Sequence, residues 1–224
     1  MNFVDRKILR ESAFHGQSLL RALHTIAVQR QTISGRTIDL GAKTNNSPYL
    51  RYLINNDATI EFSDKFSSQL QHEFDLEFDL PINDGTYNTG ILMNVLEHIH
   101  NHKNLLKEIV RILKPDGNII GFIPFLHPYH PDPLDEFRYT HTALESLMKE
   151  AGYKDISIIK VCVGRLLCLT HLATSRVAMP VRARFWIYIL AIYLSDKQKN
   201  PEESGFYGGL AFSGSKAHSD TVLA

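Results

Sequence analysis

Histidines gather in two stretches of the chain, each next to residues that could assist chemistry. The first stretch holds His98, His100 and His102 within five residues. The second is a Pro-rich loop that holds His127 and His130 together with Asp135 and Arg138. An imidazole titrates near neutral pH, so it can take a proton from a hydroxyl group. Several imidazoles together can instead hold a transition metal.

The spacing of these histidines does not favour a metal site. On a helix His98 and His102 share a face, whereas His100 does not. Adding His127 and His130 could complete a site, but no cysteine or close carboxylate set has a known zinc spacing. We therefore expect no bound metal. The polar start of a helix is the simpler account, and a metal-dependent hydrolase is kept as an alternative.

A second candidate site is the stretch Thr37-Ile38-Asp39-Leu40-Gly41-Ala42-Lys43-Thr44-Asn45-Asn46. An apolar strand start, an acid and a glycine are followed at once by a polar, turn-prone run. In an open α/β sheet the crevice at the carboxyl ends of the strands is the usual ligand site. Any turn from a strand to a helix can carry a glycine, so the meaning of this stretch depends on the elements that follow it.

The elements that must position these residues alternate along the chain. Apolar residues recur at helical spacing over residues 3–30, with a break at Gly16, and Ser34-Gly35 marks a turn. Strands are expected at 37–40, 58–62, 89–94, 118–124, 156–163 and 206–213. Helices are expected at 49–54, 105–113, 140–151, 165–178 and 181–194. This alternation predicts an α/β fold with a doubly wound, parallel sheet.

Composition limits the kinds of binding partner and the cellular compartment that we expect. Lys plus Arg and Asp plus Glu are 24 each in 224 residues, so no overall charge selects nucleic acid. Cys162 and Cys168 lie in one apolar stretch and are expected to be reduced core residues. Met1–Arg10 does not read as a signal peptide, and the apolar block Phe185–Leu194 is too short to cross a bilayer. We expect a cytoplasmic protein.

Four segments in order, from about Thr37 to Tyr153, resemble the class I S-adenosylmethionine-dependent methyltransferases. Ile38-Asp39-Leu40-Gly41 resembles the first motif, Asp64 the acid that holds the ribose hydroxyls, and Asp75-Leu76 the acidic turn beside the adenine. The most specific piece is Asn94-Val95-Leu96-Glu97-His98, followed by Leu106 to Gly117, which is similar to the motif after the fourth strand and its helix stop.

The resemblance implies a mostly parallel, seven-stranded, Rossmann-like methyltransferase fold that binds S-adenosyl-L-methionine. It implies a methyltransferase domain over residues 34–224, an N-terminal helical addition over 1–33 and a helical insertion at about 165–197. A carboxylate can accept hydrogen bonds from both ribose hydroxyls, and backbone amides at a turn suit the carboxylate of the methionine end. The cofactor-binding residues that it implies are Asp39, Gly41, Lys43, Asp64, Asp75, Leu76 and Asn94.

The first motif departs from the family at positions 43 and 45, where further glycines are usual. Glycine takes positive φ freely and Asn tolerates it, whereas Lys does so less readily. The turn could follow a different path, or cofactor affinity could be reduced. We hypothesise that Lys43 pairs with the carboxylate of the cofactor.

The loop Pro124–Thr140 resembles that of type 11 methyltransferases from bacterial surface-glycan pathways, where His, Asp-x-x-Arg and Tyr-Thr recur. This resemblance implies O-methylation of a glycan or a small hydroxylated acceptor. We expect His130 to act as the base and Asp135 to orient it or contact a sugar. Arg138 and Tyr139 are the expected substrate-binding residues.

Structural interpretations stay open beside these assignments. The acids Asp39, Asp64 and Asp75 could be polar residues of strand ends and turns, and Glu97 and His98 could simply pack a turn. Arg138-Tyr139-Thr140 could be a structural helix start. Residues 181–194 could touch a membrane surface, form a subunit interface or cover the acceptor pocket, although a core-facing helix is the simpler account. A non-catalytic binding module on the same fold is the alternative function.

Overall fold

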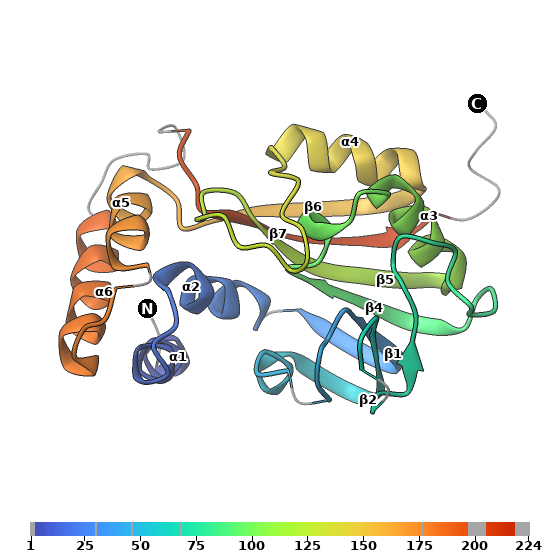
Figure 1. Cartoon of the computed structure of the whole chain (residues 1–224), viewed down its shortest axis with the longest axis horizontal. Helices are drawn as coiled ribbons and strands as arrows, with labels where there is room; N and C mark the ends of the chain where they lie inside the picture. Colours follow the sequence, from blue (N-terminus) through green and yellow to red (C-terminus); the bar gives the residue numbers. More distant parts are fainter. Residues whose placement is uncertain are drawn as a thin grey trace.

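The computed structural model describes residues 3–29, 31–45, 47–67, 69–175, 177–196 and 205–217. Their centre is one seven-stranded sheet with the strand order β3-β2-β1-β4-β5-β7-β6. Strands β1 to β5 run parallel, and β7 is antiparallel to both of its neighbours. The strands span Thr32–Leu40, Ile54–Asp64, His72–Glu73, Tyr87–Met93, Leu113–Pro124, Tyr153–Val161 and Gly209–Lys216 for β1 to β7. The predicted fold class is confirmed (Figure 1).

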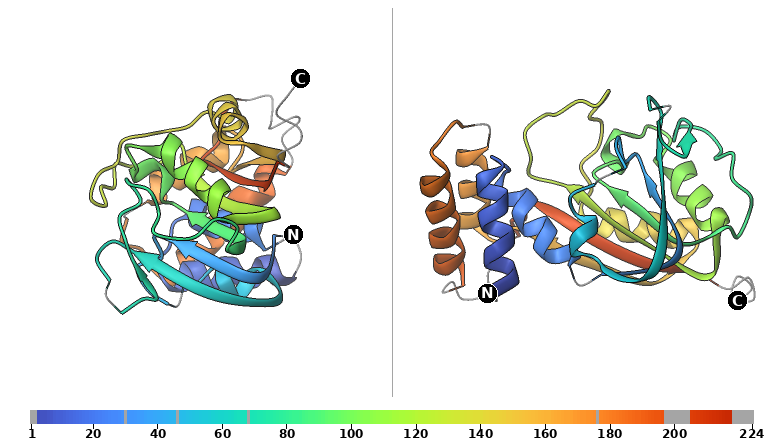
Figure 2. Two further views of the ribbon diagram at one scale, coloured as in Figure 1. Left: turned by 90° about the vertical axis from the view of Figure 1, so that its right-hand side faces the viewer. Right: turned by 90° about the horizontal axis from the view of Figure 1, so that it is seen from below.

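Helices cover both faces of this sheet. They span Phe3–Phe14, Leu19–Val28, His102–Ile112, His141–Ala151, Arg165–Thr174 and Val181–Ser195 for α1 to α6. Neighbouring residues of a strand enter different cores, because successive side chains point to opposite faces. In β4, Leu92 joins the core that contains α3 and α4, whereas Ile91 joins the core that contains α1, α2, α5 and α6. Figure 2 shows α1, α5 and α6 grouped beside one end of the sheet.

The N-terminal helices are attached to α6 by specific hydrogen bonds. Gly16, at φ +68°, ends the first helix, and the Ser18 side chain caps α2. Arg184 donates to the carbonyl of Gly16 at 2.8 Å, and Tyr188 donates to the carbonyl of Gln17 at 2.9 Å. The break predicted at Gly16 is therefore confirmed. The predicted boundary after residue 33 falls inside β1, and the division into an addition and a domain stays a prediction.

Two expected turns lie inside strands. Ser34-Gly35 is a shift in the β1–β2 register, at a position where Gly35 passes so close to Asn88 that a Cβ would lie 2.6 Å from its Oδ1 atom. Strand β5 begins at Leu113, so Lys114–Gly117 forms an irregular part of this strand. In both places the strand is paired on either side of the turn residues, and the pairing register shifts across them. The sequence indicated the interruption but not that one strand continues through it.

Other differences concern element lengths. The helix expected at 49–54 is only the 3₁₀ turn η1, Leu50–Tyr52, because β2 already begins at Ile54. The two-residue strand β3 was not expected. The stretch from Asn200-Pro201 to Gly205 also predicts a turn in the sequence, and only its Gly205 lies within the described residues. Cys162 and Cys168 are free and buried, as predicted.

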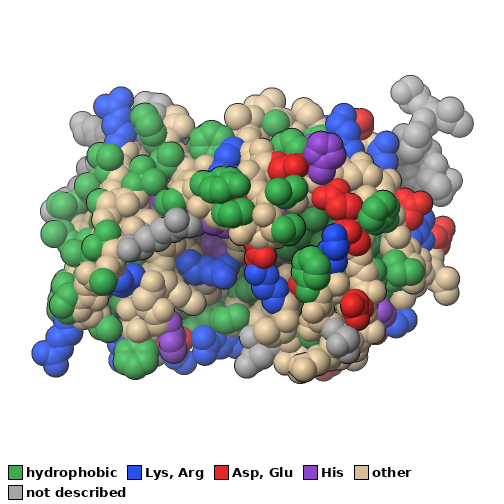
Figure 3. Space-filling model, viewed as in Figure 1, with side chains coloured by type: hydrophobic (Ala, Val, Ile, Leu, Met, Phe, Trp, Pro, Cys, Tyr) green, Lys and Arg blue, Asp and Glu red, His purple; other side chains and the backbone are tan. Residues whose placement is uncertain are grey.

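Helix α6 has two unlike faces. Tyr188 and Ala191 are buried, which confirms a core-facing side, while the opposite side exposes Trp186, Leu190 and Tyr193 by 65%, 56% and 55%. Hydrophobic side chains are prominent at this end of the surface in Figure 3. Arg184 is buried as well. No helix of the described residues is long and apolar enough to cross a membrane, and contact with a membrane surface stays a prediction.

Candidate active site

Two cavities open side by side where the parallel strands end. The first cavity has a volume of about 550 Å³ and the second about 430 Å³. Both volumes are within the range of small-molecule sites. A shared wall of five residues lines both cavities: Gly41, Lys43, Asn94, His98 and Asp132. Gly41 follows β1 and Asn94 follows β4, so the wall lies at the carboxyl edge of the sheet, as expected for this architecture.

The first cavity brings together most of the predicted cofactor residues. Asp64 ends β2, and Asp75 and Leu76 lie on the loop that follows β3. Asp64 accepts from the Phe66 amide at 2.8 Å, and Asp75 pairs with Lys65 at 2.6 Å. Both carboxyl groups line the cavity and are held in place by neighbours, so hydroxyl and amine donors of a ligand can reach them.

The first-motif turn keeps a glycine-like backbone path. Gly41 has φ +72°, and a Cβ there would lie 2.8 Å from Val95 Cγ2. Lys43 has φ +54° although it is not glycine. The altered position therefore follows a left-handed path without its usual residue, which removes the main sequence argument for a different turn. The Lys43 ammonium forms an ion pair with Asp132 across the mouth of the cavities.

Asp39 lies beneath the cavities and lines neither of them. Its side chain is fully buried in β1, and Tyr49 donates to its two carboxylate oxygens at 2.8 and 2.7 Å. Burial raises the pKa of Asp39 to about 7, against hydrogen bonds from Tyr49 and Ser47. The expected direct contact with the cofactor is thus corrected for this residue. Asp39 instead fixes Tyr49, which lines the second cavity.

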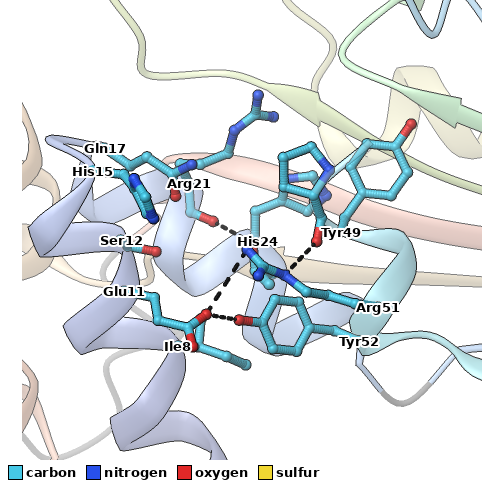
Figure 4. Close-up of a pocket in the computed structure, with 12 residues that line it drawn as sticks. Ile8, Glu11, Ser12, His15, Gln17, Arg21, His24, Tyr49, Arg51 and Tyr52 are labelled. Carbon is cyan, nitrogen blue, oxygen red and sulfur yellow. Dashed lines mark hydrogen bonds and ion pairs between the residues drawn. The ribbon is translucent and has the colours of Figure 1, made fainter. Parts of the chain in front are cut away.

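The second cavity includes residues that the sequence analysis did not select. Helix α2 contributes Arg21 and His24, which together with Tyr49 also line a neighbouring small pocket (Figure 4). The His24 ring stacks on Phe122 with centroids 3.8 Å apart. Burial lowers its pKa well below the ordinary value, and neither of its ring nitrogens has a hydrogen-bond partner. A neutral imidazole with free nitrogens can bind a polar group of an acceptor. In the sequence, His24 is one polar residue on an apolar helix face.

His130 lines the second cavity, as expected for the proposed base. Asp135 accepts from the His130 amide at 3.0 Å and lies 3.2 Å from its Nδ1 atom. The Glu97 carboxylate raises the pKa of His130, burial opposes this shift, and Asp135 adds to it. Arg138 hydrogen-bonds Asp135 and holds the pKa of that carboxyl group well below its ordinary range. The pairing of His130 with Asp135 is therefore present in the structure.

The two residues expected to bind the substrate, Arg138 and Tyr139, line neither cavity. Arg138 pairs with Asp135 at 2.7 Å. Tyr139 is 5% exposed in the core, where its hydroxyl donates to the Leu96 carbonyl at 3.3 Å. The prediction that Tyr139 contacts the acceptor is wrong for this structure. Thr140 caps α4 by accepting from Ala143 at 3.2 Å, so the structural interpretation of this segment holds.

Glu97 and His98 meet His130 at the edge of the second cavity. Glu97 is completely buried, and neither of its carboxylate oxygens has a hydrogen-bond partner. His98 Nε2 and His130 Nε2 each lie 3.7 Å from Glu97 Oε1. This cluster could not be read from the sequence, because a 33-residue separation has no motif spacing.

Comparison with known proteins identifies the central part of the chain. Residues 41–121 match the profile of a family described as a methyltransferase domain. This match runs from the turn after β1 into β5 and covers about a third of the chain. The predicted enzyme class, an S-adenosylmethionine-dependent methyltransferase, and its cofactor agree with this match. No curated protein matches the chain.

Solved structures of methyltransferases share the fold. A SAM-dependent methyltransferase from Thermotoga maritima is 13% identical with a TM-score of 0.57, over 96% of this chain and 92% of that chain. Geranyl diphosphate C-methyltransferase from Streptomyces coelicolor, solved with S-adenosyl-L-homocysteine, is 12% identical with a TM-score of 0.56, over 86% and 74%. Phosphoethanolamine N-methyltransferase 2 from Haemonchus contortus, solved with S-adenosylhomocysteine, is 11% identical with a TM-score of 0.53, over 87% and 52%.

Proposed function

We propose that the enzyme transfers the methyl group of S-adenosylmethionine to an oxygen of a glycan or a small hydroxylated acceptor. The observation that carries this proposal is the pair of adjoining cavities with one shared wall. The first cavity presents Asp64 and Asp75 for the ribose and adenine, and the shared wall presents the turn at Gly41 for the methionine end. A methyl group leaving the sulfur would then face the second cavity.

The second cavity supports an acceptor that has polar groups. It combines the apolar side chains of Phe122 and Met93 with the imidazoles of His127 and His130. A sugar or phenol ring can lie against the apolar part while its hydroxyl reaches His130. Holding acceptor oxygen, methyl and sulfur in line accounts for most of the catalysis, and proton removal adds to it.

Calorimetric titration with S-adenosylmethionine and its demethylated product tests the cofactor part of this proposal. We expect saturable binding of both, weakened in the variant Asp64→Asn. No binding at millimolar cofactor would overturn the proposal.

Incubation with panels of sugar, phenol and amine acceptors tests the acceptor part. Mass spectrometry of the products locates the added 14 mass units expected of one methyl group. We expect methylated oxygen in a hydroxylated acceptor. Methylation of amines alone would overturn the assignment to oxygen while leaving the methyl-transfer activity intact.

A further inference from the structure

The carboxylate of Glu97 lacks a counter-charge at hydrogen-bond distance. It is fully buried, and the nearest arginine of the loop, Arg138, already balances the charge of Asp135 at 2.7 Å. Its two imidazole neighbours lie 3.7 Å away, which is too long for a hydrogen bond. An isolated buried carboxylate is strongly unfavourable unless a cation balances it. A positive ion between Glu97 and the two imidazoles would supply this balance.

The two imidazoles are oriented as metal ligands usually are. The Nδ1 atom of His98 contacts the Leu134 carbonyl, and the Nδ1 atom of His130 lies 3.1 Å from the Pro128 carbonyl. A carbonyl accepts hydrogen bonds, so each contact places a proton on Nδ1. In a neutral ring, Nε2 then carries the free electron pair, and both Nε2 atoms face Glu97. Ligating histidines in proteins are commonly fixed by such a contact on the other nitrogen.

The distances fit a small ion. Two ligands of a tetrahedral ion with bonds of about 2.0–2.1 Å lie about 3.4 Å apart. The two observed separations from Glu97 to the histidines are 3.7 Å, and the three ligand atoms lie within 4.8 Å of one another. Side-chain movements of about 1 Å would bring the three ligand atoms to bonding distance of one ion. Among the described residues, this is the one group of three or more such ligands found together.

We propose that Glu97, His98 and His130 bind a first-row divalent metal ion of the zinc type, with an open coordination position toward the second cavity. Two imidazoles and one carboxylate suit zinc, cobalt or iron better than magnesium, which prefers oxygen ligands. His98 and His130 both line the second cavity, so a ligand there can reach the fourth position.

A bound ion would refine the acceptor chemistry, and in this respect the inference rests on the proposed function. A hydroxyl on a metal ion loses its proton more readily than a free one, and the proton would pass to water in the second cavity. His130 then serves as a ligand and no longer as the base, and the acceptor oxygen is held at the wall that the two cavities share. Metal binding itself does not depend on the identity of the acceptor.

Cobalt titration of the chelator-stripped full chain tests the proposal. We expect one equivalent of Co²⁺ to bind with the intense visible absorption of tetrahedral coordination, and Zn²⁺ to displace it. The variants Glu97→Gln and His130→Ala should each weaken binding at least tenfold. Because Glu97 is fully buried and its variant could fail to fold, His130→Ala, at a side chain 26% exposed, keeps the test decisive.

His100→Ala is the matched control, because this side chain is 79% exposed and lies two residues from His98 outside the cluster. It should bind Co²⁺ as the wild type does. The proposal is overturned by no binding at about 1 mM Co²⁺ or Zn²⁺, by equal loss in His100→Ala, or by ready displacement of Co²⁺ by Mg²⁺. Cofactor calorimetry on the same samples separates the two ideas, since cobalt binding without cofactor binding would sink the proposed function alone.

Discussion

The two cavities share a wall but are built in different ways. The first cavity is lined by loop segments that follow strands β1 to β5, from Gly41 to Leu134, and its Asp64 and Asp75 lie close to one another in the chain. The second cavity draws on α2, the loop after β1, strand β5 and the loop that follows it, so its lining spans residues 17 to 132. The loops at the strand ends of the first cavity carry motifs that can be recognised in the sequence. The residues that α2 and β5 add to the second cavity carry no such motif, and so the cofactor is easier to identify than the acceptor.

Asp39 offers the largest expected effect, and it concerns the support of the second cavity, because this residue of β1 fixes Tyr49. Its folded-state pKa is raised from 3.8 to about 7. The native state therefore binds the proton more tightly, and its stabilising effect is complete below about pH 4 and lost as pH rises through about 7. The loss reaches about 4 kcal/mol, from about 1.4 kcal/mol per pKa unit.

Urea unfolding of wild type and Asp39→Asn between pH 4 and pH 8 measures this effect. The free energy of unfolding of the wild type should fall relative to that of the variant across this range. In Tyr49→Phe the carboxylate loses a hydrogen bond to its ionised form, so the fall should be steeper. Parallel pH profiles for wild type and Asp39→Asn would show that Asp39 does not titrate as described.

Asp64→Asn sharpens the comparison, because it should act on the first cavity alone. A neutral amide accepts more weakly from ribose hydroxyls, so cofactor affinity should fall about 10- to 100-fold, or about 1.4–2.7 kcal/mol. The KM for the acceptor should stay unchanged. Calorimetry and steady-state kinetics measure the two quantities. Glu73→Gln is the control, since Glu73 pairs with Asp64 in the β2–β3 ladder and lines neither cavity. Equal effects of the two changes would contradict the assignment.

Gly41→Ala should affect both cavities, because Gly41 belongs to their shared wall. The added methyl group meets Val95 at 2.8 Å, and φ +72° strains any residue with a Cβ. We expect a loss of about 1–2 kcal/mol in unfolding free energy and weaker cofactor binding. Adding Val95→Ala should relieve the contact and leave the backbone strain. If the double variant regained nothing in urea unfolding, the contact with Val95 would not matter.

Lys43 gives the smallest expected effect and separates charge from backbone conformation. Lys43→Gly should raise the unfolding free energy by about 0.5–1 kcal/mol, since glycine adopts positive φ without strain. The ion pair with Asp132 contributes little, because its side chains are 63% and 48% exposed. If the ammonium binds the carboxylate of the cofactor, Lys43→Gly and Lys43→Ala should both weaken affinity several-fold. Unchanged affinity in Lys43→Ala would refute that contact.

Sequence predicted the elements of the fold and most of the first cavity. The helix break at Gly16 and the cap at Thr140 depend on local chemistry and were confirmed. Six of the seven predicted cofactor residues line the first cavity, because their motif fixes them to the ends of strands. Asp39 is the exception. Its position in the motif did not reveal that Tyr49 would occupy both of its oxygens.

The second cavity was predicted only in part, for a physical reason. His130 and Asp135 lie five residues apart, so their pairing can be expected from the loop alone. The contact of Glu97 with His130 and the stacking of His24 on Phe122 depend on how separate elements pack. Tyr139 was misassigned because an aromatic residue near a site can equally fill the core beneath it. Such choices are decided by tertiary packing, which one sequence does not display.

The place of β7 has a consequence for the order in which the chain can fold. Strand β6 hydrogen-bonds only to β7 within the described sheet, and β7 lies at residues 209–216, after α5 and α6. During synthesis β6 therefore leaves the ribosome about fifty residues before its partner strand does. Until then β6 has no strand to pair with. Strand β5, which precedes the loop of the second cavity, still lacks its neighbour β7. Domains formed by such late, long-range pairing fold slowly and are prone to aggregate while they wait. A chain shortened before β7 would be expected to lose its sheet edge even though every residue that lines the two cavities was already present.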